Sequence, residues 1–153
     1  MQPILVTPTD IEAALDAVHG IALRTPTHAF RETDGKLLLK LENLQRLGAF
    51  KIRGAWNRMS RLSEADRRRG VTTISSGNHG LAVAWSARRL GLTCTVHVPQ
   101  GAAGPKVDAI RAQGAAVREM ARGDLVRAHT EELWKSGPEP FVHPFAHPLV
   151  IEG

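Results

Sequence analysis

Short apolar strand patterns alternate with helical patterns from residue 49 onward, and this alternation restricts the possible fold more than any other feature of the sequence. Strands are predicted over residues 70–75, 93–98, 115–119 and 141–142, and helices over residues 52–62, 81–90, 106–113 and 124–135. A helix between two strands carries the chain back to the same end of a sheet, so that the strands pair in parallel. The pattern predicts an α/β fold with an open parallel sheet flanked by helices.

The first 47 residues carry a sparser pattern. A helix is expected over residues 11–18, capped by Thr9 or Asp10, and Asp34-Gly35 is a turn signal before a strand over residues 36–41. These elements are too few to close a hydrophobic core by themselves.

Composition argues against several kinds of partner. The 153-residue chain has a net charge of +5, but its basic residues are scattered, and the densest group, Arg67-Arg68-Arg69, ends a predicted helix where cations oppose the helix dipole. We therefore expect a solvated basic surface and no nucleic-acid partner. There is no apolar run of transmembrane length and no signal peptide, and the lone Cys94 excludes an internal disulfide, so we expect a cytoplasmic protein without membrane contact. No metal site is predicted, because Pro144 separates His143 from His147 and prevents a shared helix.

The first candidate for chemistry is Lys51, one of only five lysines in the chain. It follows Phe50, and small residues stand on both sides at Gly48, Ala49 and Gly54. An amine in such an apolar turn is desolvated, which lowers its pKa and makes it available as a nucleophile or a base. The alternative is a lysine at a helix start with its amine in water.

The second candidate is the loop Ser75-Ser76-Gly77-Asn78-His79-Gly80, which directly follows a predicted strand and opens a helix. Ligands of open α/β sheets bind at the carboxyl ends of strands, and a helix N-terminus offers free N–H groups to an anion. A small carboxylate or phosphate would suit this loop. The alternative is an ordinary turn in which Asn or Ser caps the helix.

The order of these motifs along the chain carries further information. Lys40 to Gln45 precedes Gly48 to Ala55, the loop from Ser75 to Gly80 follows one helix and one strand later, and His143-Pro144-Phe145 comes last. This order resembles the fold-type II pyridoxal-phosphate-dependent enzymes, closest to the branch of threonine and serine dehydratases and serine racemases. The resemblance covers nearly the whole chain from Arg24 onward.

The resemblance implies a role for each matching residue. Lys51 is similar to the lysine that binds pyridoxal 5′-phosphate covalently and then removes the Cα proton of the substrate, and Phe50 to the residue that packs beside the cofactor ring. Asn78 resembles the asparagine that hydrogen-bonds the 3′-oxygen of the cofactor. The loop Ser75, Ser76, Gly77, Asn78 and His79 resembles the loop that binds the substrate carboxylate. Ser76 stands where racemases carry a second acid or base on the opposite face of the cofactor; one base suits β-elimination, and two opposed bases suit racemisation.

The chain departs from the pattern of this family in three ways. Ala49 stands where the family usually has Ser or Thr, and Leu47 stands where threonine is frequent. The family also continues beyond Gly153 for about as many residues again, and the missing half would hold the glycine-rich loop for the cofactor phosphate. We therefore expect residues 1–47 to be the N-terminal part of a large domain, residues 48–137 a small α/β domain, and residues 138–153 a truncated return to the large domain.

The implied activity is dehydration and deamination of L-threonine or L-serine, with serine racemisation as a related activity. The alternatives are another enzyme of β-elimination or β-replacement, such as a cysteine-synthase-like one, and an inactive fragment that serves only as a folding or interaction module. A small amino acid is the expected substrate, and a homo-oligomer is the expected assembly of the full-length form.

Overall fold

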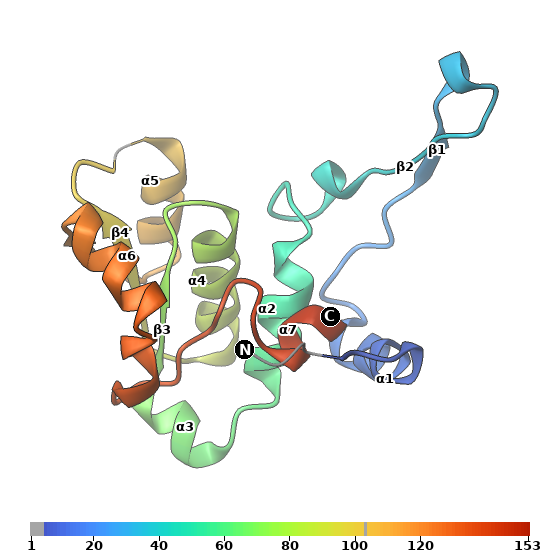
Figure 1. The fold of residues 1–153 in the computed structure, drawn as a ribbon. Coiled ribbons are helices and arrows are strands. Elements are labelled where there is room, and N and C mark those ends of the chain that lie inside the picture. Colours follow the sequence, from blue (N-terminus) through green and yellow to red (C-terminus); the bar gives the residue numbers. More distant parts are fainter. Residues whose placement is uncertain (1–4, 103) are drawn as a thin grey trace.

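The computed structural model describes residues 5–102 and 104–153 and contains two separate sheets (Figure 1). The larger sheet has the strand order β3-β4-β5, and all its strands are parallel; their bounds are β3 (Val71–Ile74), β4 (Cys94–Pro99) and β5 (Ala116–Met120). The predicted α/β fold with an open parallel sheet is confirmed. The predicted strand over residues 141–142 is present only as a single parallel bridge between Phe141 and Thr72.

Seven helices and three 3-10 turns are described. The helices are α1 (Pro8–Val18), α2 (Lys51–Ser60), α3 (Glu64–Arg69), α4 (Asn78–Leu90), α5 (Pro105–Ala112), α6 (Arg122–Thr130) and α7 (Pro148–Glu152), and the 3-10 turns are η1 (Arg31–Thr33), η2 (Glu42–Leu44) and η3 (Leu133–Ser136). None of the helices within the described ranges is long and apolar enough to cross a membrane.

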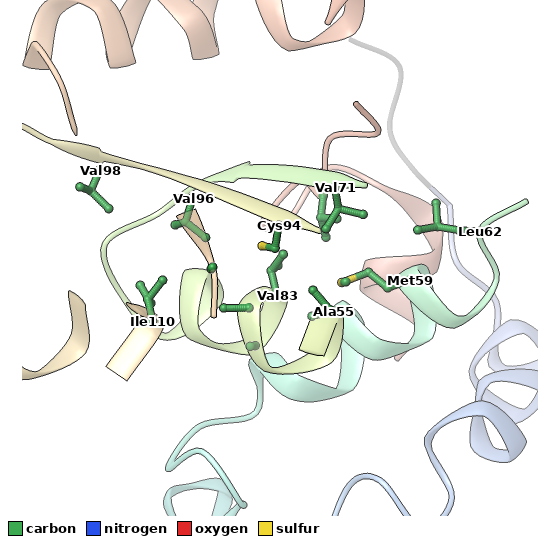
Figure 2. Close-up of a cluster of buried hydrophobic side chains, with 14 residues drawn as sticks. Ala55, Met59, Leu62, Val71, Val83, Cys94, Val96, Val98 and Ile110 are labelled. Atoms are coloured by element: carbon green, nitrogen blue, oxygen red, sulfur yellow. The ribbon is translucent and has the colours of Figure 1, made fainter. Parts of the chain in front are cut away.

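The hydrophobic core lies between the sheet and helices α2, α4 and α5 (Figure 2). Cys94, Val96 and Val98 alternate with less buried residues along β4, so that one face of this strand meets the helices. Met59 of α2 and Ile110 of α5 are fully buried against the same cluster. Helix α6 contacts β4, and Trp134 of η3 stacks on Phe141, which bridges to β3.

Two helix boundaries differ from the sequence-based expectation. The N-cap of α1 is Thr7 and neither Thr9 nor Asp10, because Pro8 occupies the first helical position and Asp10 completes a reciprocal capping box with Thr7. The predicted helix over residues 124–135 is wrong as a continuous element. It breaks at Glu132, whose φ of 51° is left-handed, and the chain continues as η3.

The hairpin of β1 (Thr27–Ala29) and β2 (Leu38–Lys40) projects away from the rest of the chain (Figure 1). Its turn contains Asp34 and Gly35, both with positive φ. All six strand residues are exposed, and Leu38 keeps 63% of its surface accessible. The hairpin thus has no hydrophobic face covered by the described residues.

The C-terminal segment returns across α2. It leaves the bridge at Phe141 and ends in α7, which packs on α2 (Figure 1). The side-chain amide of Asn57 donates to the carbonyl of Leu149 at 2.7 Å. Gly54 makes this approach possible, because a Cβ at that position would lie 2.1 Å from the carbonyl oxygen of Val150.

We therefore predict that Gly54→Ala separates α7 from α2 and lowers the free energy of unfolding by about 1–3 kcal/mol, since a forced contact in a packed interface is destabilising. Chemical denaturation followed by circular dichroism measures the effect. Gly123→Ala in α6 is the matched control, because nothing lies within 4 Å of the added Cβ; it should leave stability unchanged or raise it by up to about 1 kcal/mol. Equal stability of the two variants would contradict the packing role of Gly54.

Candidate active site

Lys51 is the first residue of α2 and projects toward the returning C-terminal segment. Its Nζ donates a hydrogen bond to the carbonyl oxygen of Pro144 at 2.7 Å, although the two residues are 93 positions apart. The side chain is partly buried, and this burial lowers the pKa of the Lys51 amine. Phe50 lies beside it with its ring centroid 5.1 Å from Nζ, and this residue is 56% exposed. The amine is thus held by a backbone carbonyl.

The loop before α4 is fixed by its own backbone and by one serine. The Ser75 N–H donates to the carbonyl of His97 at 3.0 Å, which ties the loop to the neighbouring strand, and Ser75 Oγ accepts the N–H of Gly77 at 3.2 Å. Gly80 packs tightly beneath the loop, because a Cβ there would lie 2.2 Å from the carbonyl oxygen of Ser75. The Ser76 hydroxyl has no hydrogen-bond partner among the described residues. The Ser75 oxygen is thus engaged as an acceptor and keeps its O–H to donate, whereas the Ser76 hydroxyl is wholly available to a ligand.

The first turn of α4 faces outward at Asn78, its first residue, which is exposed. Gly77 is the N-cap and supplies no side chain to the helix end. The first N–H groups of a helix have no intrahelical acceptor, and the helix dipole adds partial positive charge there. The loop and this helix end can together receive a small anion.

The imidazole of His79 points the other way, into the protein. The residue is only 4% exposed, and its Nε2 lies 2.9 Å from the carbonyl oxygen of Val142. Since only an N–H can donate to a carbonyl, the neutral ring carries its proton on Nε2. Burial lowers the pKa of His79 to about 4, and the nearby charge of Lys51 acts in the same direction. Its side chain thus belongs to the wall behind the loop, and only its backbone N–H lies at the helix end.

Residues 142–144 connect the two predicted motifs. The carbonyl of Val142 accepts from Thr73 Oγ1 at 2.8 Å and from His79, and the carbonyl of Pro144, two residues later, accepts from Lys51. Sequence reasoning identified His143-Pro144-Phe145 only through the resemblance. It missed Thr73 and Val142, because a threonine within a strand and a valine after a proline-rich turn carry no local signal for such contacts.

A second polar cluster, also missed by sequence reasoning, joins α2 to the N-terminal segment. Arg53 makes two parallel hydrogen bonds of 2.9 Å to the carboxylate of Glu42, which also accepts from Thr25 and Gln45. These bonds hold the pKa of Glu42 at about 2, with the Arg53 guanidinium as the largest cause. The cluster fixes the start of α2, and hence Lys51, relative to residues 23–45.

A cavity of about 270 Å³ lies beside Lys51. It is lined by Phe50, Lys51, Arg53, Gly54, Pro144, Phe145, Val150, Ile151 and Gly153. A larger hollow of about 1050 Å³ lies between α1 and the Glu42–Arg53 pair and also includes Phe50. Neither includes a residue of the Ser75–His79 loop, and residues 142–144 link the two motifs by hydrogen bonds.

Comparison with known proteins gives consistent matches over most of the chain. The family described as pyridoxal-phosphate dependent enzyme matches residues 18–153. L-Threonine ammonia-lyase of Thermotoga maritima is 37% identical over 97% of this chain and 38% of its own length, and L-threo-3-hydroxyaspartate ammonia-lyase of Pseudomonas sp. is 44% identical over 94% of this chain and 47% of its own length. The crystal structure of serine racemase from Dictyostelium discoideum superposes with a TM-score of 0.84 at 35% identity and covers 97% of this chain and 50% of that one. The chain spans about half the length of these relatives, or less.

We predict that His79 makes the stability of the fold dependent on pH. The unfolded chain binds a proton at His79 below its ordinary pKa of 6.5, whereas the folded chain does so only near pH 4. Because the unfolded state binds more protons in this window, the free energy of unfolding should fall by up to about 3 kcal/mol as the pH drops from 6.5 to 4.

Denaturant titrations of the wild type and of His79→Gln at several pH values measure this effect. The Gln amide can still donate to Val142 but does not titrate, so its stability should fall less over the window. Parallel stability profiles for the two proteins would contradict the buried, neutral state of His79.

Proposed function

Since the chain belongs to the pyridoxal-phosphate dependent enzyme family, we propose that it supplies the amine and the substrate-carboxylate loop of an active site that dehydrates and deaminates L-serine or L-threonine, with racemisation of serine as a related activity. The observation that carries the proposal is the position of the Lys51 amine, which is partly buried and held at 2.7 Å from the Pro144 carbonyl. Relatives named as ammonia-lyases and racemases favour this activity over β-replacement.

The described residues fit one side of the cofactor. Lys51 provides an amine with a lowered pKa, Phe50 an exposed ring beside it, and Asn78 an exposed amide at the start of α4. Within residues 5–102 and 104–153 we find no glycine-rich loop comparable to one that holds a phosphate dianion. The phosphate would therefore be held by residues outside the described part. When bound, pyridoxal phosphate withdraws electrons from the Cα of the amino acid and makes its proton acidic.

Each residue of the chain then has a distinct task. Lys51 accepts the Cα proton at Nζ, which requires the free amine that burial favours. The N–H groups at the start of α4 and the loop hydroxyls bind the substrate carboxylate. Ser76, whose hydroxyl is not used within the described fold, either adds a donor to that carboxylate or exchanges the proton on the face opposite Lys51.

We further propose that the full-length enzyme is cytoplasmic and forms a homo-oligomer. The single cysteine of the 153-residue chain, Cys94, is a buried free thiol whose pKa burial raises to about 12, as suits a reducing compartment. The exposed leucines of the β1–β2 hairpin offer apolar surface that a subunit contact or the rest of the enzyme could cover.

We predict that Lys51 is the lysine that reacts with the cofactor. The chain is incubated with millimolar pyridoxal phosphate, because the described residues offer no glycine-rich loop for the phosphate, then reduced with borohydride and mapped by mass spectrometry. The pyridoxyl label should accumulate on Lys51 in preference to the four other lysines, since a lowered pKa leaves more free amine. Lys51→Ala should lose this label, whereas Lys106→Ala should keep it. A label spread evenly over the lysines would reject Lys51.

The role of Ser76 is testable in a chimaera in which this chain replaces the matching half of the Dictyostelium serine racemase. If Ser76 is the second base, Ser76→Ala should lower the rates of racemisation and of D-serine processing by more than about 100-fold, while elimination from L-serine largely survives. Ser75→Ala is the comparison variant, because it removes the neighbouring hydroxyl, whose oxygen accepts the Gly77 N–H, and its loss should affect both enantiomers alike. Similar losses for both enantiomers, mainly in KM, would instead assign Ser76 to carboxylate binding.

A further inference from the structure

His143 builds the turn that holds the Pro144 carbonyl. The residue is buried, and its Nδ1 accepts two backbone N–H groups, from Phe145 at 3.1 Å and from Ala146 at 2.7 Å. An atom that accepts two N–H donors presents a lone pair, so the neutral ring carries its proton on Nε2. The ring also packs edge-on against Trp134, Phe141 and Phe145, with centroids 4.7–5.8 Å apart.

The turn has a fixed point on its upstream side. The Val142 carbonyl accepts hydrogen bonds from Thr73 Oγ1 and His79 Nε2, and the Val142 N–H donates to the carbonyl of Thr72 at 2.8 Å. These bonds fix where the backbone enters the turn. The two hydrogen bonds accepted by His143 Nδ1 then hold the turn around Pro144. The Pro144 carbonyl is the acceptor for the Lys51 amine.

We propose that His143 is a positioning residue for Lys51, acting through the turn that its Nδ1 closes around Pro144. The importance of Lys51 rests on the function proposed above, but the contact itself does not involve the cofactor. An ordered carbonyl acceptor favours the ammonium form and keeps the amine in one place. Without Nδ1 the two N–H groups lose their acceptor, the turn opens, and the carbonyl moves away from Nζ.

His147 provides an internal comparison four residues later. Its Nδ1 also accepts a backbone N–H, that of Leu149 at 3.2 Å, and caps α7. No hydrogen bond, ion pair or ring contact links His147 to Lys51 among the described residues. Loss of the His147 acceptor should therefore disturb α7 without releasing the amine.

The test measures the reactivity of each lysine toward trace acetic anhydride at pH 8, by mass spectrometry and with no cofactor present. In His143→Leu, which keeps the volume but removes the acceptor, Lys51 should react about 3- to 10-fold faster than in the wild type, relative to the other four lysines. His143→Asn should restore the wild-type rate within about twofold, because an Asn side chain accepts the same N–H groups in a local turn. His147→Leu should leave the Lys51 rate unchanged.

Two results would overturn the proposal: an unchanged Lys51 rate in His143→Leu, or an equal increase in His147→Leu. If His143→Leu does not fold, nitrogen NMR of the wild-type ring decides, since a proton on Nδ1 would exclude its acceptor role and a proton on Nε2 would support it. Failure of cofactor trapping on Lys51 would reject the proposed function but leave these rates as they are. The two proposals can therefore fail separately.

Discussion

The parallel pairing of β3 on both of its edges is the constraint on which the site depends. On one side β3 pairs with β4, and on the other Thr72 bridges to Phe141. Because parallel neighbours end at the same edge of a sheet, the loop after β3 and the turn after Phe141 emerge together. Helix α2 packs along α4, and its first residue meets this turn. Lys51 and the loop that begins at Ser75 lie 24 residues apart in the sequence. Both now meet residues 142–144, whose position is set by the pairing of Phe141 with β3.

Polar contacts then fix this arrangement, and most of them join a side chain to a backbone carbonyl. A carbonyl cannot change its chemistry by mutation, so the acceptor is determined by the path of the chain and only the donor is encoded by residue type. Buried donors such as Thr73 and His79 must find acceptors, since an unmade hydrogen bond in the interior costs about 1–3 kcal/mol. The same requirement makes the return segment specific, because residues 142–144 satisfy donors from β3, α4 and α2.

Local pattern predicted much of the fold and identified the residues on which the proposed site is built. The run Thr93 to Val98, ended by Pro99, predicted β4, and the structure adds that every second residue of this strand is buried. The interruption of the predicted helix at Glu132 was not predictable, since a residue other than glycine in the left-handed conformation leaves no pattern in the sequence. Contacts over 63 to 93 residues, such as those of His79 and Lys51, depend on tertiary packing. The division into residues 1–47, 48–137 and 138–153 stays a prediction, as do the catalytic and binding roles of the loop.

The burial of Cys94 gives the chain a built-in chemical reporter. The thiolate is the reactive form of cysteine, and a thiol whose pKa is raised to about 12 is almost entirely protonated near neutral pH. It also lies in the core between the sheet and the helices, where a reagent has no access (Figure 2). A thiol-directed dye would therefore modify this protein only in molecules whose core has opened. With no second cysteine to compete, the rate of modification would time the opening of the β3–β4 sheet in the native population.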